Sequence, residues 1–180
     1  MTDEELIDAI RGGDTDSLDQ LVERYYRDVL QYVCRRTGDF DAAGDITQDV
    51  FVRIVGVILR FRNENFKGYL FTVARHACMD HFRKRKRTTG RWEPIEEYDD
   101  VKAAGPDPME SAERRQADEE AERMLRCLTR RQRDVVELRA LHGLELKEIG
   151  RVLDIPLSQV KNRLYAGLVR LRKEVNRDED

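Results

Sequence analysis

"LELKEIGRVLDIPLSQVKNRLYAGLVRLRKEV", residues 144–175, is the most informative stretch of this 180-residue chain. Apolar residues recur at steps of three and four on both sides of a short segment, residues 154–156, which predicts two helices joined by a tight turn. The second helix is long, basic and amphipathic. This pattern is typical of a helix-turn-helix. The apolar positions that would pack the two helices together are Ile149, Val152, Ile155, Val160 and Leu164.

The other face of the second predicted helix carries polar side chains near its start. They are Ser158, Gln159, Lys161, Asn162 and Tyr165. Such groups can read base edges in the major groove, while Lys and Arg hold phosphates. The plain alternative is that they form the solvated face of a surface helix. The preceding turn and the Arg-rich flanks favour binding to duplex DNA.

The first half of the chain is also predicted to be helical. A capping box formed by Thr2 and Glu5 starts a short helix that ends at Gly12. Three longer amphipathic helices follow, over about 18–36, about 41–59 and from about residue 66 into the basic run 83–87. No stretch alternates as a strand does. The fold class is therefore predicted as all-α, with a four-helix bundle in this half.

Acidity is concentrated in one segment of the chain. The formal net charge is −3, but residues 92–122 alone hold 12 Asp and Glu against 3 Lys and Arg. Helical periodicity is lost there, and three of the four prolines lie within it. We therefore predict two small helical domains, residues 1–91 and 113–180, joined by an acidic flexible linker over 92–112.

The third predicted helix has an acidic stripe. Asp41, Asp45 and Asp49 are spaced four apart, with Gln48 beside them. Like charges at this spacing oppose helix formation by about 0.2–0.5 kcal/mol per pair. The positive end of the helix accounts for the first of them, but its effect fades after one turn. The stripe, with Phe51 and Arg53 expected to be exposed beside it, suggests docking on a basic partner protein.

The fourth predicted helix combines aromatic and cationic residues. Aromatic rings can stack on unpaired bases, and cations can hold the nucleic-acid backbone. Phe71 and Phe82 are expected to belong to the core, whereas Phe66 and Tyr69 are candidates for base stacking.

Enzymatic activity and cofactor binding have no support in the sequence. "HACMDH", residues 76–81, brings His and Cys together, but it lacks the four suitably spaced ligands of a zinc site. No phosphate-binding loop, nucleophile elbow or acid–base pair is found. Three widely spaced cysteines and the absence of a membrane span or signal peptide predict a cytoplasmic protein that is not inserted in a membrane.

Taken together, these segments resemble the bacterial sigma factors of the extracytoplasmic-function (ECF) group, in the sigma-70 superfamily. Residues 21–55 and 60–87 are similar to region 2, and residues 128–174 are similar to region 4. The resemblance implies that region 2 binds RNA polymerase core at the β′ clamp helices and melts the −10 element. It implies that region 4 binds the −35 element and the β flap, and that an anti-sigma factor is a further partner.

Three groups of site residues follow from the motifs and the resemblance. For polymerase binding they are Asp45, Gln48, Asp49, Phe51 and Arg53. For the −10 element they are Phe61, Arg62, Phe66, Tyr69, Arg75, His76, Asp80, Arg83, Lys84 and Arg85. For the −35 element they are Ser158, Gln159, Lys161, Asn162, Arg163 and Tyr165.

The chain departs from the family pattern at several positions. Val55 and Tyr69 stand where Trp is usual, His76 where Asn is usual, and Glu145 where Ser or Thr commonly caps a helix. Asp154 replaces a common turn Gly, but Asp tolerates the left-handed conformation well. Two alternatives remain: a free-standing helix-turn-helix regulator that binds duplex DNA without polymerase, and a helical adaptor or RNA-binding protein.

Overall fold

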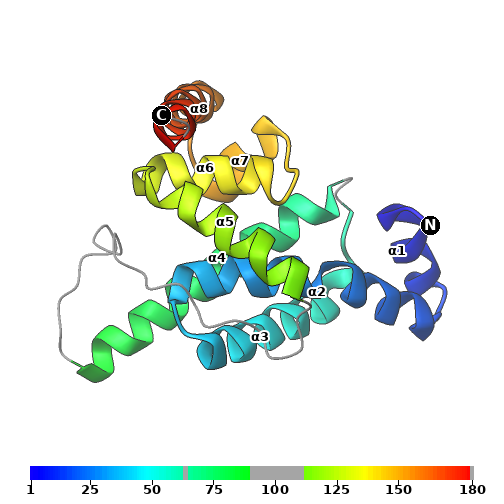
Figure 1. Cartoon of the computed structure of the whole chain (residues 1–180). Helices are drawn as coiled ribbons and strands as arrows, with labels where there is room; N and C mark the ends of the chain where they lie inside the picture. Colours follow the sequence, from blue (N-terminus) through cyan, green and yellow to red (C-terminus); the bar gives the residue numbers. More distant parts are fainter. Residues whose placement is uncertain (63–64, 90–111, 179–180) are drawn as a thin grey trace. The chain divides into compact units, whose positions relative to one another are not determined.

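The computed structural model describes residues 1–62, 65–89 and 112–178. These residues form eight α-helices and contain no strand, which confirms the predicted all-α class (Figure 1). The chain divides into two compact units, Met1–Ile95 and Glu96–Asp180. The predicted linker, 92–112, lies outside the described residues except for Ala112, which begins a helix.

Four helices build the first unit, and α2 is central to it. They are α1 (Asp3–Arg11), α2 (Thr15–Thr37), α3 (Phe40–Ile58) and α4 (Phe66–Thr89). The second helix packs against each of the other three. Tyr32 of α2 and Phe71 of α4 are fully buried and meet edge to face, with ring centroids 5.2 Å apart. This contact removes two large apolar surfaces from water at the centre of the unit.

Local signals set the ends of these helices. Thr2 and Glu5 form the predicted capping box of α1, with hydrogen bonds of 2.7 and 3.2 Å. Gly38 closes α2 in the left-handed conformation, with φ 65°, and its N–H donates to the Cys34 carbonyl. Asp39 then caps α3 by accepting from the Ala42 N–H at 3.1 Å. The break between the second and third predicted helices therefore lies where the sequence placed it.

The second unit contains the predicted helix-turn-helix. Its helices are α5 (Ala112–Arg126), α6 (Arg130–Ala140), α7 (Leu146–Leu153) and α8 (Leu157–Asp178). Asp154 ends α7 with φ 54°, so the expected left-handed turn forms without glycine. Gly150 allows a close approach in this turn, since a Cβ there would lie 3.0 Å from the Ile155 carbonyl oxygen. Val160 is fully buried, as the apolar pattern predicts.

A buried polar contact that was not predicted from the sequence lies at the end of α6. Glu137 and His142 are both about 2% exposed, and the His142 Nε2 lies 3.6 Å from the Glu137 Oε1. The backbone N–H of His142 also donates to the Glu137 carbonyl at 3.3 Å. These contacts hold the chain as it turns from α6 toward α7.

The crossing of α6 and α8 depends on a glycine. A Cβ at Gly167 would lie 2.8 Å from Cγ2 of Val136, a buried β-branched side chain with little freedom to move. By contrast, a Cβ at Gly44 in α3 would meet nothing within 4 Å. Both glycines lie within helices, but only Gly167 is in a place where a side chain would clash with a neighbouring helix.

We therefore expect opposite effects from the same substitution at these two glycines. Gly167→Ala should lower the free energy of unfolding of the second unit by about 1–2 kcal/mol, since overpacking outweighs the gain in helix propensity. Gly44→Ala should raise that of the first unit by about 0.5–1 kcal/mol. Urea denaturation followed by circular dichroism measures both. Stabilisation by Gly167→Ala would contradict the close α6–α8 contact.

Candidate nucleic-acid interface

The start of α8 presents polar side chains to solvent. Ser158, Gln159, Lys161 and Asn162 are exposed, and so is Tyr165 at 73%. The neighbouring Arg163 is half-buried, and its guanidinium donates to the Gln159 side-chain oxygen at 2.9 Å.

This face can bind duplex DNA. Its donors and acceptors project from the second helix of the helix-turn-helix, which is the element that enters the major groove in such motifs. The Lys161 ammonium and the two side-chain amides supply hydrogen bonds to base edges or phosphates.

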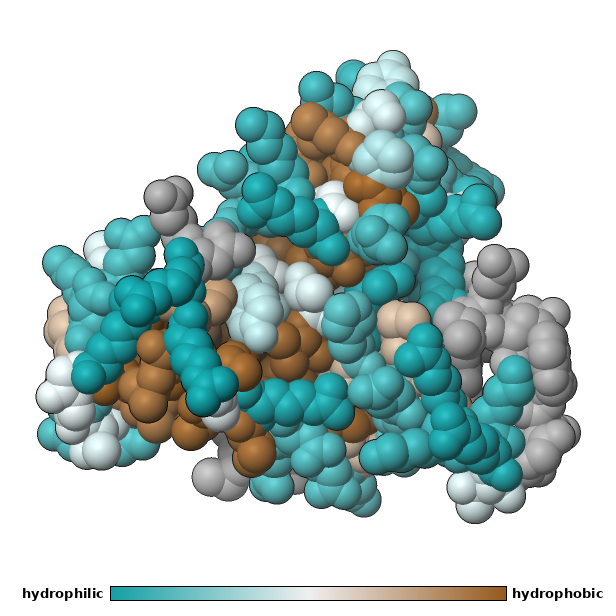
Figure 2. All heavy atoms as spheres, turned by 180° about the vertical axis from the view of Figure 1, so that it is seen from behind, coloured by the Kyte–Doolittle hydropathy of each residue, from teal (hydrophilic) through white to brown (hydrophobic). Residues whose placement is uncertain are grey.

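The outer face of α3 has two parts. Its first half is acidic, with Asp41, Asp45, Gln48 and Asp49 exposed. Its second half is apolar, with Val52 71% and Val55 45% exposed, and the C-cap residue Leu59, 59% exposed, continues it. The opposite face, which includes Ile46, Val50, Ile54 and Ile58, is buried. Apolar side chains also interrupt the largely hydrophilic surface seen in Figure 2. An acidic and apolar helix face of this kind suits a protein partner better than nucleic acid.

Two residues predicted beside this stripe lie elsewhere. Phe51 is 7% exposed, because it continues the buried arc and its ring stacks on Tyr26 of α2 at a centroid distance of 5.9 Å. The prediction that Phe51 is exposed was therefore wrong. Arg53 is exposed, but its guanidinium turns toward α4 and lies 3.4 Å from the Asp80 carboxylate.

A cationic pocket lies between α3 and α4. Arg53 and Arg83 contact opposite oxygens of the Asp80 carboxylate at 3.4 and 3.5 Å. With His76 and Met79 they line an open pocket of about 410 Å³. The three charged groups are 42–55% exposed, so these ion pairs are weak, and two guanidiniums share one carboxylate. The arrangement leaves positive charge available to a phosphate. Sequence reasoning did not place Arg53 here, because a contact between two helices leaves no local pattern.

The aromatic residues at the start of α4 form a packed cluster. Phe66 is 3% exposed and lies between Tyr25 and Phe61, with both centroid distances 5.7 Å. Phe61 is 9% exposed, and Tyr69 is half-buried with its ring 5.1 Å from that of Phe61. The expectation that Phe66 offers a free stacking face was therefore wrong, because its ring closes the core. Of the two candidates for base stacking, Tyr69 is the one whose ring is partly open.

The remaining predicted −10 residues lie along α4 and the turn before it. Arg62, His76, Arg83, Lys84 and Arg85 are exposed, and Arg75 is half-buried. Asn65 caps this helix by accepting from the Gly68 N–H at 2.7 Å. The run of cations thus occupies the solvent-facing last turns of a helix whose start is fixed in the core.

The described residues contain neither a disulfide nor a metal-binding cluster. Cys34, Cys78 and Cys127 are not joined in disulfides; the first two are buried, and Cys127 is partly buried. Within the ranges that the structure describes, no group of three or more His, Cys, Asp or Glu side chains is placed to hold a metal ion. No helix in those ranges has the length and apolar character needed to cross a membrane.

Comparison with known proteins identifies both units. The Sigma-70 region 2 family matches residues 21–88, and the Sigma-70, region 4 family matches residues 118–171, which together make up more than half of the chain. The chain belongs to the sigma-70 family. Similarity to the ECF RNA polymerase sigma factor SigW of Bacillus subtilis (strain 168) is 28% identity over 176 residues, with 94% of each chain covered.

Two solved structures share the fold of this sigma factor. CnrH in complex with the cytosolic domain of CnrY superimposes with a TM-score of 0.67 at 20% identity, and the match covers 98% of both chains. The sigma factor RpoE in complex with the anti-sigma factor NepR from Bartonella quintana gives a TM-score of 0.64 at 19% identity, covering 88% of this chain and 96% of that one. Both comparisons support the all-α architecture with two helical regions.

Burial separates the aromatic residues that stabilise this sigma factor from those that are free to bind. Phe66→Ala should lower the free energy of unfolding of the first unit by about 3–5 kcal/mol, because a buried ring is lost from the cluster. Tyr165→Ala, at an exposed position, should change that of the second unit by less than about 0.5 kcal/mol. Denaturant titration of both variants provides the test, and a stable Phe66→Ala protein would argue that the ring is not part of the core.

Proposed function

We propose that this chain is a sigma factor that directs RNA polymerase core to specific promoters and takes part in opening them. One observation carries the proposal. A single chain with both sigma-70 regions carries, in its first unit, an acidic and apolar helix face and, in its second unit, a helix-turn-helix with an exposed polar face. DNA binding alone accounts only for the second of these surfaces.

In this proposal the outer face of α3 binds the polymerase core at the β′ clamp helices. Asp45, Gln48 and Asp49 supply charge and hydrogen bonds to a basic surface, and exposed Val52 and Val55 supply apolar contact. Charged rims raise the rate and specificity of such associations, while the apolar part contributes buried area. Phe51 supports this face from within the core instead of contacting the partner.

The −10 element binds along α4 in the same proposal. Arg53 and Arg83, beside His76 in the pocket, hold backbone phosphates near the melting site. Lys84 and Arg85 extend the positive charge along the duplex. Tyr69 is the ring on which an unstacked base can rest.

The −35 element binds at the start of α8, with Lys161 and Asn162 in the groove and Arg163 holding Gln159 in place. The β flap is the protein contact of this region. We further propose that an anti-sigma factor covers part of these surfaces. Leu168 and Val169, 51% and 39% exposed on α8, support a protein contact there.

The chain has no catalytic role of its own in this proposal. It acts in the cytoplasm together with the polymerase, which performs the chemistry. A free-standing helix-turn-helix regulator is the second candidate, but it would leave the exposed α3 face without a function.

The deciding experiment is transcription in vitro from a promoter library, by core polymerase with and without the purified protein. We expect a small set of promoters to become active only when the protein is present. If no promoter requires it, while the protein alone binds duplex DNA tightly and specifically, the regulator is the better description.

Reversal of charge on α3 tests the polymerase contact. Asp45→Arg combined with Asp49→Arg should abolish measurable core binding in a pull-down, because repulsion replaces attraction at a basic surface. The fold should be retained, since both side chains are exposed. Asp19→Arg with Glu23→Arg on α2 is a matched control, with two exposed acids at the same spacing. Unchanged affinity in the α3 variant would disprove the assignment.

Removal of two side chains on α8 tests promoter reading. Lys161→Ala with Asn162→Ala should relax the choice of −35 sequence, since a good base contact discriminates by about 1–3 kcal/mol. Arg172→Ala with Lys173→Ala, exposed near the other end of α8, should weaken binding without changing the preferred sequence. Selection from randomised −35 sequences measures both, and an unaltered preference in the first variant would point to readout of DNA shape.

A further inference from the structure

The first helix lies outside the matched family segment but is tied into the first unit at both ends. Region 2 begins to match at residue 21, whereas α1 covers Asp3–Arg11. Its apolar face, Leu6, Ile7 and Ile10, is buried. Burial alone explains why the helix is present. It does not explain the polar contacts that the helix makes with more distant parts of the unit.

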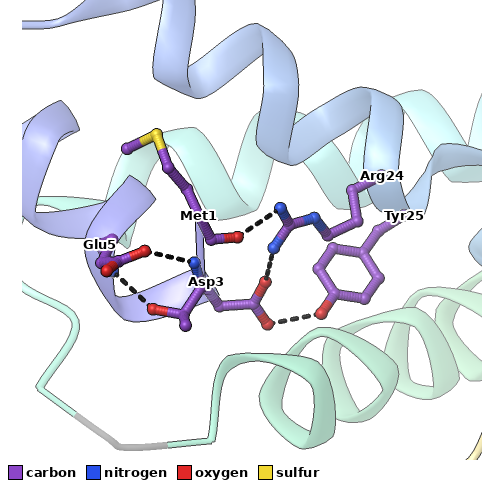
Figure 3. A network of polar contacts seen from close by, with 6 residues as sticks. Met1, Asp3, Glu5, Arg24 and Tyr25 are labelled. Atoms are coloured by element: carbon purple, nitrogen blue, oxygen red, sulfur yellow. Dashed lines mark hydrogen bonds and ion pairs between the residues drawn. The ribbon is translucent and has the colours of Figure 1, made fainter.

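The N-terminal end of α1 is fixed to α2. The Asp3 carboxylate accepts a hydrogen bond from the Tyr25 hydroxyl at 2.5 Å and from the Arg24 guanidinium at 2.7 Å (Figure 3). Arg24 also donates to the Met1 carbonyl at 2.7 Å. Burial, together with the hydrogen bond to Asp3, raises the pKa of Tyr25 above its ordinary value, so the hydroxyl remains a donor even in alkaline solution.

The C-terminal end of α1 reaches the turn that follows α3. One guanidinium nitrogen of Arg11 contacts the Asp8 carboxylate at 2.6 Å, and another donates to the carbonyl of Phe61, fifty residues later. Among the described residues of this turn, the Arg60 N–H donates to the Val57 carbonyl at 2.9 Å and the Phe61 N–H donates to the Ile58 carbonyl at 3.2 Å. The Arg11 guanidinium adds a hydrogen bond from a distant helix to the Phe61 carbonyl.

Both ends of α1 act on the same aromatic cluster. Tyr25, held by Asp3, packs against Phe66, and Phe66 packs against Phe61, whose carbonyl is held by Arg11. Phe61 in turn contacts Tyr69. The helix α1 therefore contacts this cluster at two points. Its N-terminal end binds the Tyr25 side chain, and its C-terminal end binds the Phe61 carbonyl.

We propose that α1 positions Phe61, just after the end of α3, and through it Tyr69 of α4 for promoter opening, with Arg11 as the positioning residue. The inference rests on the proposed function, because it assigns −10 melting to the Phe61–Tyr69 region. Side chains that are fixed in advance lose less conformational freedom when an unstacked base binds beside them, so base capture competes better with base pairing. Arg11 itself touches no DNA in this account.

The test compares a duplex promoter with the same promoter premelted across its −10 region. Arg11→Ala, assayed in the full-length protein with core polymerase, should form open complexes on the duplex about tenfold less, which is typical for loss of a hydrogen bond to a charged group. On a saturating concentration of premelted promoter, opening is no longer required. The amount of transcript made with Arg11→Ala should then stay within about twofold of the wild-type amount. Core affinity should be unchanged.

Two further variants separate positioning from folding. Asp8→Ala removes the exposed partner but leaves the guanidinium on Phe61, and it should behave as wild type. Arg11→Lys keeps one charged donor, and it should restore part of the duplex activity. Tyr25→Phe, which removes only the hydroxyl, should show a smaller loss with the same duplex preference, and it provides the test if Arg11→Ala does not fold.

The outcomes distinguish this inference from the function on which it rests. Equal losses on duplex and premelted promoters, accompanied by a lower unfolding midpoint, would show that α1 only completes the core. Wild-type rates for Arg11→Ala on both templates would also overturn the positioning role. Failure of the wild-type protein to activate any promoter would overturn the proposed function itself, and the inference with it.

Discussion

The exposed faces of α3 and α8 depend on one constraint, which is that a helix at the edge of a small core buries only its apolar face. Both units are small, so their cores are thin and such helices are covered on one side. In α3 the buried face is apolar, which leaves the aspartates and Val52 outward. In α8 burial of Val160 turns Lys161 and Asn162 to solvent. The surfaces that we assign to partners are therefore consequences of core packing.

Burial also sorts the aromatic residues into two chemical roles. Phe66 and Phe61 close the core at the start of α4, and their packing stabilises the bundle at a place where DNA is expected to bind. Tyr69 and Tyr165 keep part or most of their rings exposed. A rigid cluster beneath a partly open ring is a favourable arrangement for binding a base, because little conformational freedom remains to be lost.

Much of this organisation could be predicted from sequence. The capping box at Thr2, the glycine stop at Gly38 and the left-handed Asp154 all depend on residues within a few positions of each other. The predictions that failed concern residues at the border between the buried and the exposed surface of a helix, or at a helix end. Phe51 lies at the border of the buried arc, where helical spacing alone does not decide whether a ring turns inward. Phe66 was assigned to a surface because its position at a helix start gives no periodic context.

The sequence by itself determined the helices, their ends, the helix-turn-helix and the acidic stripe, because these follow from periodicity and local hydrogen bonding. Only the tertiary structure decided that Arg53 joins Asp80 and Arg83, that Phe66 is core, and that Arg11 holds the carbonyl of Phe61. Each of these contacts joins residues far apart in the chain. Their partners are chosen by how helices pack, and no local pattern in the sequence records that choice.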